Sequence, residues 1–288
     1  MPIECSLPMR CFGQEEFHDV DHCVTGLSFE VHNDLGRFFD ERVYRDALAN
    51  RCEEAGFSAR REVVVRVSHK DFVKDYYLDL VIADGVLYEL KTSDALVPTH
   101  EKQLINYLLL TDQRHGALLN FRTASVQKRF VSTTLTREKR QDVNIKREQW
   151  DSSGPDSRRC LEILAELLAD WGAFLDVGLY HEAVLHNLGG GRKLECVTKV
   201  ETGNGPAIPY RFHILDGKAI LHVSAATRYL DSYQKHLSRM VARTQLEAVH
   251  WINFNKRNIM ATTVKNPNKN NSAMHYSAIA RSQRTSIC

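Results

Sequence analysis

The sequence predicts an α/β (α+β) fold in which a mixed central sheet is flanked by helices, and this arrangement is expected twice along the chain. The apolar pattern changes from a helical period to an alternating one and back between residues 24 and 121. The 288 residues, 43% of them hydrophobic, are enough for two domains of ordinary size. Two gapless alignments, given below, relate the first half of the chain to the second.

The first two expected elements are amphipathic helices. Apolar residues recur at helical spacing from Val24 to Leu35, and Gly36 follows as a C-cap. A second helix is expected over residues 37–55, with Gly56 after its end. The residues of this second helix expected to face inward are Phe39, Val43, Ala47 and Leu48.

A three-strand meander is expected next, because the apolar period changes to two. Strands are predicted over residues 61–67, 76–82 and 86–91, where β-branched and aromatic residues are frequent. A helix from Thr99 to Thr111 follows, with Thr99 as its cap, and then a short buried strand over residues 116–121. This order of helices and strands favours a mixed sheet.

The hairpin over residues 76–94 carries three charged residues, Asp79, Glu89 and Lys91, among apolar ones. Glu89 and Lys91 share one face of their strand because they are two residues apart. A two-residue turn would direct Asp79 to the other face, whereas a three-residue loop, 83–85, with Gly85 at positive φ places Asp79 on the same face. The sequence Ala-Asp-Gly suits the three-residue loop, which we therefore expect. Two facing carboxylates repel each other unless a hard cation lies between them. The alternative is a structural Lys–Glu pair on an exposed sheet.

Polar residues on the helices point to the same region. His100, Gln103 and Tyr107 share one face of their helix, and Glu41 and Tyr44 share a face of the second helix. Such residues suggest a common polar pocket, although an isolated Tyr or His is commonly a core residue.

These motifs resemble a known superfamily. The pattern D-x9-E-L-K formed by Asp79, Glu89 and Lys91 resembles the signature of PD-(D/E)XK nucleases, and QLINY (Gln103 to Tyr107) resembles the QxxxY element of RecB-like members. Five elements in order within residues 22–125 are similar to the GxxExxY proteins, a prokaryotic branch of that superfamily. The family's first glycine corresponds to Phe38 here, whereas Glu41 and Tyr44 remain. The resemblance implies a restriction-endonuclease-like core.

The resemblance also implies a metal-dependent nuclease acting on nucleic acid, with DNA expected over RNA. Asp79, Glu89 and the Leu90 carbonyl would bind Mg²⁺ or Mn²⁺. Lys91 would hold the attacking water or the developing charge, and Glu41 would complete the metal shell or bind a second ion. Gln103 and Tyr107 would orient the lysine or a phosphate. Basic residues that could hold the backbone, or form a solvated face, are Lys128, Arg129, Arg137, Lys139 and Arg140.

The second half aligns with the first but lacks its charges. Residues 34–48 align with 170–184, and residues 100–121 with 233–254. Val177 stands opposite Glu41, His222 opposite Glu89, Ser224 opposite Lys91 and His236 opposite Gln103, while Arg211 and Phe212 lie near the counterpart of Asp79. We therefore expect an inactive second copy, packed with the first as an intrachain pseudo-dimer or binding a partner protein. A non-catalytic binding scaffold, or a subunit of a defence or repair complex, is the rival function.

The expected domains are an N-terminal extension (1–21), the nuclease-like domain (22–140), a linker (141–157), the degenerate repeat (158–263) and a basic flexible tail (264–288). No apolar run could span a bilayer and no secretory signal is present, so a cytoplasmic protein without membrane partners is expected. The seven cysteines form no CxxC pair, which favours free thiols over a zinc site; the segment HDVDHC (18–23) also lacks ligand spacing. The net charge of +2 is too small to indicate nucleic acid by itself.

Overall fold

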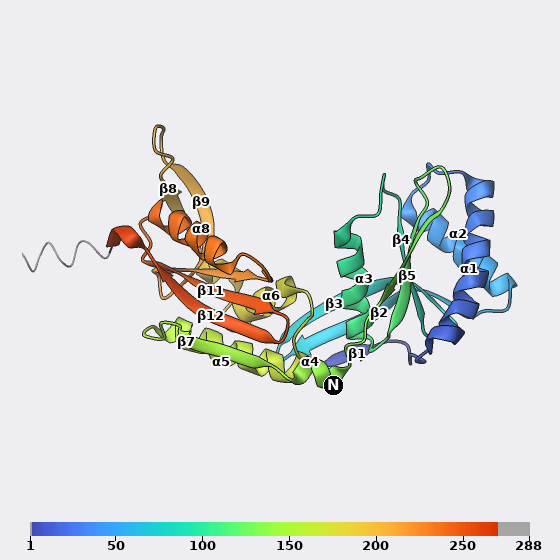
Figure 1. The fold of residues 1–288 in the computed structure, drawn as a ribbon, viewed down its shortest axis with the longest axis horizontal. Coiled ribbons are helices and arrows are strands. Elements are labelled where there is room, and N and C mark those ends of the chain that lie inside the picture. The colour runs from blue at the N-terminus through green and yellow to red at the C-terminus, as the bar shows by residue number, and fades with distance from the viewer. Residues whose placement is uncertain (1, 270–288) are drawn as a thin grey trace, which may run out of the picture. The chain divides into compact units, whose positions relative to one another are not determined.

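The computed structural model describes residues 2–269. The chain divides into two compact units, described separately here: the first comprises Met1–Gln141 with Asp170–Asp176, and the second comprises Asp142–Ala169 with Val177–Cys288. Each unit contains one mixed six-stranded sheet flanked by helices (Figure 1). The expected α/β class is confirmed.

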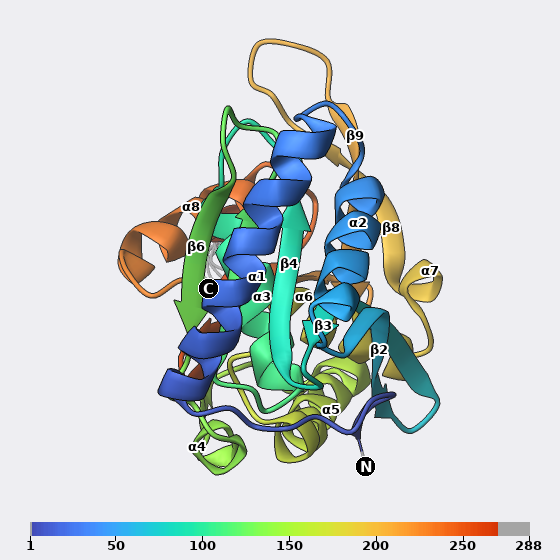
Figure 2. The same ribbon diagram turned by 90° about the vertical axis from the view of Figure 1, so that its right-hand side faces the viewer.

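The sheet of the first unit has the order β1-β2-β3-β4-β5-β6. All neighbouring strands are antiparallel except β4 and β5, which are parallel and joined through α3. Helices α1 and α2 cover one face of the sheet, and α3 lies behind it (Figure 2). The elements are β1 (Ile3–Cys5), α1 (Gln14–Leu35), α2 (Glu41–Glu54), β2 (Ala59–His69), β3 (Phe72–Ile82), β4 (Val86–Lys91), α3 (Pro98–Leu110), β5 (His115–Asn120), β6 (Gln127–Ser132) and α4 (Arg137–Gln141).

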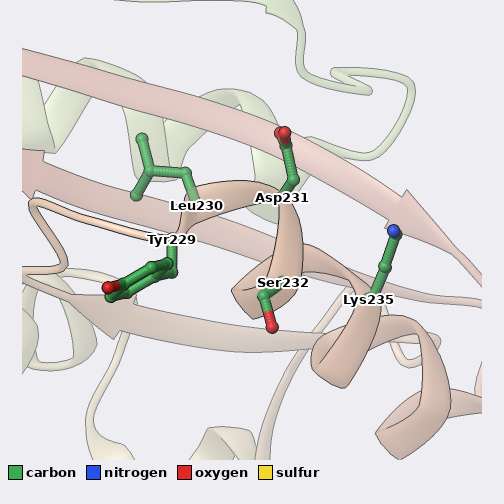
Figure 3. A pocket seen from close by; sticks show the side chains of 5 residues that line it. All are labelled: Tyr229, Leu230, Asp231, Ser232 and Lys235. Carbon is green, nitrogen blue, oxygen red and sulfur yellow. The ribbon is translucent and has the colours of Figure 1, made fainter.

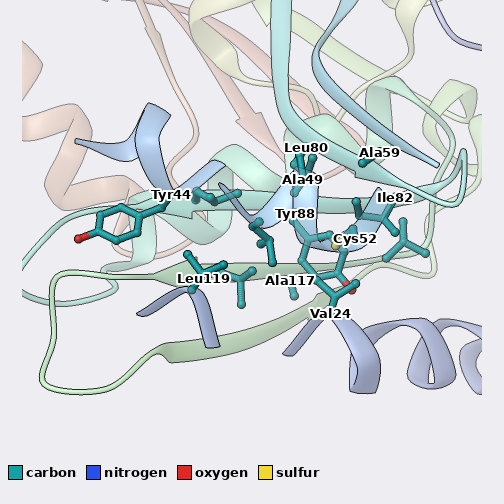
Figure 4. Packing of buried hydrophobic residues seen from close by; sticks show 14 of the residues in the cluster. Val24, Tyr44, Ala49, Cys52, Ala59, Leu80, Ile82, Tyr88, Ala117 and Leu119 are labelled. Atoms are coloured by element: carbon teal, nitrogen blue, oxygen red, sulfur yellow. The ribbon is translucent and has the colours of Figure 1, made fainter. Parts of the chain in front are cut away.

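The core between this sheet and the first two helices is built from alternate strand residues. Leu80 and Ile82 on β3 and Tyr88 and Leu90 on β4 are 0–1% exposed and pack with residues of α1 and α2 (Figure 4). Full burial of each such side chain contributes about 1.5–3 kcal/mol. Because successive strand residues face opposite sides, the residues between them point to the α3 face. This alternation decides where the charged residues lie.

Several local expectations were wrong. Helix α1 begins at Gln14, ten residues before Val24, and α2 begins only at Glu41. Phe39 therefore precedes its helix and is 48% exposed, and Val43 is 39% exposed. The buried face of α2 consists of Tyr44, Leu48, Ala49 and Cys52.

The start of α3 and the segments outside the expected repeats also differ from the sequence interpretation. Thr99 does not cap α3, because its N-cap is Val97 and Pro98 occupies the first turn. The expected N-terminal extension contributes β1, which pairs with β2, and the expected linker contributes β7 of the second sheet. In the expected tail, Asn266 is 1% exposed and its amide donates to the Leu246 carbonyl at 2.7 Å. Residues 270–288 lie outside the described residues, so the expected flexibility there remains a prediction.

The second unit repeats this topology. Its sheet has the order β7-β12-β11-β10-β9-β8, in which β10 and β11 are parallel and joined through α8, while β8-β9, β9-β10 and β11-β12 are antiparallel. The added edge strand β7 runs parallel to β12. The elements are β7 (Asn144–Gln149), α5 (Pro155–Trp171), α6 (Val177–Asn187), α7 (Gly191–Leu194), β8 (Glu195–Val200), β9 (Ile208–Leu215), β10 (Ala219–Ser224), α8 (Leu230–Ala242), β11 (Ala248–Asn255) and β12 (Asn258–Lys265).

The two units also share side-chain contacts at aligned positions. Asn120 on β5 is fully buried, donates to the Ser93 carbonyl at 2.7 Å and accepts from the Ser93 amide at 3.1 Å. Asn253 on β11 is equally buried and makes the same two bonds with Ala226, at 2.9 and 2.8 Å. We call each arrangement an asparagine clamp. It ties the loop that leaves the central strand to the end of the neighbouring parallel strand.

An aromatic pair provides a second shared contact. The rings of Tyr44 and Phe121 stack with centroids 4.7 Å apart, and those of Tyr180 and Phe254 lie 4.6 Å apart. Helices α2 and α6 begin at the aligned residues Glu41 and Val177. Among the residues that the structure describes, no helix is both long and apolar enough to cross a bilayer.

Candidate active site

The hairpin of β3 and β4 determines the orientation of the acids. Leu80 pairs with Tyr88 and Ile82 with Val86, so the loop has three residues, 83–85. Continuing this register sets Asp79 opposite Glu89, and both residues belong to the α3 face. The three-residue loop was expected, but its conformation was not.

Positive φ angles occur at Ala83 (52°) and Asp84 (57°), whereas Gly85 is not in that region. A glycine is needed at position 85 for a steric reason instead. A Cβ at this position would overlap the carbonyl oxygen of Arg10 and the ring of Phe12. The N-terminal segment therefore runs directly across the loop, and the Arg10 amide donates to the Asp84 carbonyl at 2.8 Å.

Four charged side chains meet at the end of β4. Asp79 Oδ2 accepts a hydrogen bond from the Leu90 amide at 2.9 Å. Lys91 Nζ donates to Glu89 Oε1 at 2.6 Å and lies 3.8 Å from Glu41 Oε2. Glu89 is only 1% exposed, whereas the Glu41 side chain is 38% exposed. The lysine thus lies between a buried carboxyl group and one open to solvent.

Burial raises the pKa values of all three acids. Burial and the charge of Asp79 raise the pKa of Glu89 to about 8, against the opposing effect of Lys91. Burial also raises the pKa of Asp79, although the Leu90 amide, Lys91 and a hydrogen bond with Glu89 lower it. The pKa of Glu41 rises through burial, opposed by Lys91. Near neutral pH, the Asp79–Glu89 pair therefore retains a proton in the absence of a cation.

Lys91 behaves in the opposite way to most buried lysines. Burial by itself would lower its pKa, but the charge of Glu89, their hydrogen bond, Glu41 and Asp79 outweigh burial and raise it. Lys91 is consequently a cation at neutral pH and not a proton acceptor.

Helix α3 contributes the remaining predicted residues. Gln103 Nε2 donates to Tyr107 Oη at 3.1 Å. Burial raises the pKa of Tyr107, and Glu89 and Asp79 add to this effect, so the phenol lies within electrostatic reach of both acids. The pKa of His100 is lowered by burial and by Lys91 and Arg129. All six predicted site residues thus belong to the first unit, and α3 completes the wall opposite the strands.

Two supporting residues were not assigned these roles from the sequence. Tyr44 Oη donates to the Gly36 carbonyl at 2.9 Å and accepts from the Phe39 amide at 3.1 Å, which fixes the loop that leads to Glu41. Arg45, one residue further along α2, contributes a positive charge that lowers the pKa values of Asp79 and Glu41. Its spacing of four residues from Glu41 was the available sequence signal.

The basic residues expected to hold a nucleic-acid backbone are mostly engaged elsewhere. Arg140 is 2% exposed and donates to the carbonyls of Leu109 and Trp171, so its expected phosphate contact was wrong. Lys128 donates to Asp21 Oδ2 at 2.6 Å, and Arg129 pairs with Glu101. Arg137 is partly exposed and Lys139 is exposed.

The donor set fits a hard cation. The amide of Phe121, directly after β5, donates to the Lys91 carbonyl. By strand alternation the Leu90 carbonyl therefore turns toward β3, the side on which Asp79 lies. Two carboxyl groups and one backbone carbonyl are oxygen ligands of the kind that Mg²⁺ and Mn²⁺ prefer. Side chains alone do not complete a site: within residues 2–269, no three His, Cys, Asp or Glu residues are grouped to hold a metal.

The corresponding region of the second unit has no carboxyl group at the aligned positions. His222 Nε2 lies 2.7 Å from Tyr233 Oη, and burial lowers the pKa of this histidine. Ser224 Oγ donates to Asn253 Oδ1 at 2.7 Å and accepts from Trp251 Nε1 at 2.8 Å. Neutral hydrogen bonds thus replace the ion pairs of the first unit.

Comparison with known protein families gives a match to the first unit. No curated protein and no solved structure matches the chain. Residues 18–132 match the family model described as the PD-(D/E)XK nuclease superfamily. This segment lies within the first unit and contains Glu41, Asp79, Glu89, Lys91, Gln103 and Tyr107. The match suggests nuclease activity for the first unit of this chain.

Proposed function

We propose that the first unit is a metal-dependent nuclease that hydrolyses phosphodiester bonds in nucleic acid, with DNA preferred over RNA. The observation that carries this proposal is the convergence of Asp79, Glu89 and Lys91 on one sheet face, inside the segment that matches the nuclease superfamily. A lone Lys–Glu surface pair does not account for it, because Glu89 is 1% exposed and faces a second acid. Burying two acids together is unfavourable, and such sites are typically functional.

Asp79, Glu89 and the Leu90 carbonyl would hold Mg²⁺ or Mn²⁺. When bound, the ion would lower the pKa of water and neutralise charge on the phosphate. Lys91, held cationic by Glu89 and Glu41, places a positive charge beside the reacting phosphate and stabilises the negative charge that develops there. Glu41 is half-buried, and burial raises its pKa, which suits it to accept a proton from the attacking water.

The α3 residues have a positioning role in this proposal. Gln103 holds the Tyr107 hydroxyl, and Tyr107 lies within electrostatic reach of Asp79 and Glu89. This hydrogen bond fixes the position of the phenol hydroxyl, which can then orient a phosphate oxygen or Lys91.

We further propose that residues 158–263 are a degenerate copy of residues 22–140, separated by the segment 141–157. The support is the shared strand order, the shared asparagine clamp and the stacked Tyr–Phe pair. His222, which stands in the place of Glu89, cannot supply an oxygen ligand for a hard cation. Ser224, which stands in the place of Lys91, carries no positive charge. The second unit is therefore non-catalytic.

A cleavage assay tests the proposal. Labelled single- and double-stranded DNA and RNA are incubated with the full chain and Mg²⁺, Mn²⁺ or a chelator. We expect metal-dependent cleavage that Asp79→Asn, Glu89→Gln and Lys91→Ala each abolish. His222→Ala, purified in the same way, is the matched control and should cleave normally. Cleavage that survives all three changes in the first unit would place the activity elsewhere or in a contaminant.

A further inference from the structure

Charge is distributed unequally between the two units. The first unit contains 19 Lys and Arg against 24 Asp and Glu, whereas the second contains 19 against 12. The unit with the proposed catalytic site is thus acidic, with a net charge of −5, and the other is basic, with +7. A polyanion is attracted to the second unit, although the net charge of the whole chain is only +2.

A surface groove of the second unit lies along α8. Two adjoining hollows of about 460 and 660 Å³ share Asp231 and Lys235 as lining residues. One hollow opens at the start of α8 (Figure 3), and the other lies between α8 and the end of β12. The lining residues are Tyr229, Leu230, Asp231, Ser232, Gln234, Lys235, Ser238, Thr263, Val264 and Lys265.

The cations at this groove are available to a ligand. Lys235 lines both hollows. Arg239 follows it on α8 four residues later, about 6 Å further along the helix axis, and Arg243 comes directly after the helix; both are exposed and lie beyond the lining residues. Lys265 from β12 lines the same groove. None of these four cations forms an ion pair with another described residue of the chain. Asp231 is the one acid in the lining, and it projects from the same side of α8 as Lys235 (Figure 3).

Tyr229 presents an aromatic ring at the mouth of the groove. It is 83% exposed and has a left-handed backbone conformation, with φ at 56°, directly before α8. Bulky residues rarely adopt this conformation. Its carbonyl accepts the first hydrogen bond of the helix, from the Tyr233 amide at 2.9 Å, so the fold uses its backbone and leaves the ring in solvent. A solvent-exposed ring beside a row of cations is the arrangement with which proteins bind single-stranded nucleic acid.

We propose that this groove binds a single strand of nucleic acid, with phosphates at Lys235, Lys265 and Arg239 and a base stacked on Tyr229. The inference rests on the proposed function, to which it adds a substrate class: nucleic acid with a single-stranded segment. The degenerate unit would then supply substrate affinity that the acidic catalytic unit lacks.

The test measures binding separately from cleavage. Binding of a short fluorescein-labelled single-stranded oligodeoxynucleotide is followed by fluorescence anisotropy in a chelator, using the full chain with Lys91→Ala. Adding Lys235→Ala and Lys265→Ala should reduce the slope of log K against log salt by about 1.4, which corresponds to about 25-fold weaker binding near 0.1 M salt. The matched control, Lys146→Ala with Lys256→Ala, removes two exposed cations of the same unit away from the groove and should leave the slope unchanged.

The ring and the acid give independent readouts. Tyr229→Ala should weaken binding at least about five-fold, whereas Tyr229→Phe, which keeps the ring, should bind normally. Asp231→Asn should strengthen binding, because it removes the only negative charge of the lining. Equal losses from the groove and control variants would indicate diffuse attraction and overturn the proposal. Equal binding of a duplex would overturn the single-strand assignment.

The two proposals fail in different ways. Groove-dependent binding by a chain that cleaves no substrate would sustain the inference and reject the nuclease function. Metal-dependent cleavage by a chain whose oligonucleotide binding is unchanged in the groove variants would support the nuclease function and reject the inference about the groove.

Discussion

Replacing Glu89 with glutamine should change how stability depends on pH. In the unfolded chain Glu89 has a pKa near 4.5, and in the folded protein burial and Asp79 raise it to about 8. Between these values the folded state holds a proton that the unfolded state has lost. The free energy of unfolding therefore falls as pH rises through this window, and above the folded pKa the full contribution, about 5 kcal/mol, is lost.

Glutamine resembles the protonated acid and does not titrate, so Glu89→Gln should lack this slope. Burial also raises the pKa of Asp79, and this burial is the same in the natural protein and the variant. Lys91 keeps Glu41 as a second partner at 3.8 Å. The variant should thus gain stability relative to the natural protein as pH rises, by up to about 5 kcal/mol at pH 9. This corresponds to a melting temperature about 10–20 °C higher for a unit of this size.

Differential scanning calorimetry in a chelator, from pH 5 to pH 9, measures this difference. Histidines with lowered pKa, such as His181 and His222, stabilise the fold as pH rises through about 6.5. Their contribution is the same in both proteins and cancels in the comparison. Glu30→Gln, which removes an exposed acid of α1, should follow the natural protein. A difference between Glu89→Gln and the natural protein that stays constant across this range would refute the assignment of a shared proton to the acid pair.

Three further predictions follow from the same contacts. At pH 7, Mg²⁺ binding should release about one proton, detected by calorimetry in buffers of different ionisation enthalpy, and Glu89→Gln should abolish this release; uptake or no release would contradict it. Asn120→Ala and Asn253→Ala should each cost about 1–2 kcal/mol in urea unfolding, because each leaves a half-buried backbone amide and carbonyl without their partner; a neutral result at either site would reject the clamp. Gly85→Ala should cost at least about 3 kcal/mol through overlap with the Arg10 carbonyl, whereas Gly217→Ala, in open space but at φ +69°, should cost about 1 kcal/mol; equal costs would contradict the steric argument.

The sequence predicted the structure well where apolar periodicity defines a strand and where the spacing of charged residues decides which face of the sheet they share. Strand β4 was predicted with its observed bounds, Val86–Lys91, because a mostly apolar run, interrupted by Glu89, starts after the Asp-Gly turn and ends at Lys91. The three-residue loop followed from requiring Asp79 and Glu89 to share a face. Local pattern could not reveal that Arg10 crosses this loop, since that contact joins residues far apart in sequence. The reason for Gly85 was therefore missed.

The errors have a common physical origin in long-range contacts. Arg140 was interpreted as a surface cation because its neighbours are polar, yet its guanidinium is buried and donates to the carbonyls of Leu109 and Trp171. Residues 144–149 alternate too weakly to be recognised as a strand, and they form β7 because the edge of β12 accepts them. Tyr229 was not singled out from the sequence, because apolar periodicity identifies buried residues and the proposed role of Tyr229 depends on its exposed ring.

The contacts of the asparagine clamp are made by other residues than those at the positions of Glu89 and Lys91. Asn120 lies on the strand beside Glu89 and Lys91, and Asn253 lies on the strand beside His222 and Ser224, so the clamp is present with or without charges on the neighbouring strand. The chain thus contains its own reference scaffold: one sheet bears a cluster of buried charges, and the other bears neutral residues at the same positions. Comparing the unfolding of the two sheets within a single molecule would relate the stability of each fold to the presence or absence of buried charges, with solvent, temperature and chain length held identical.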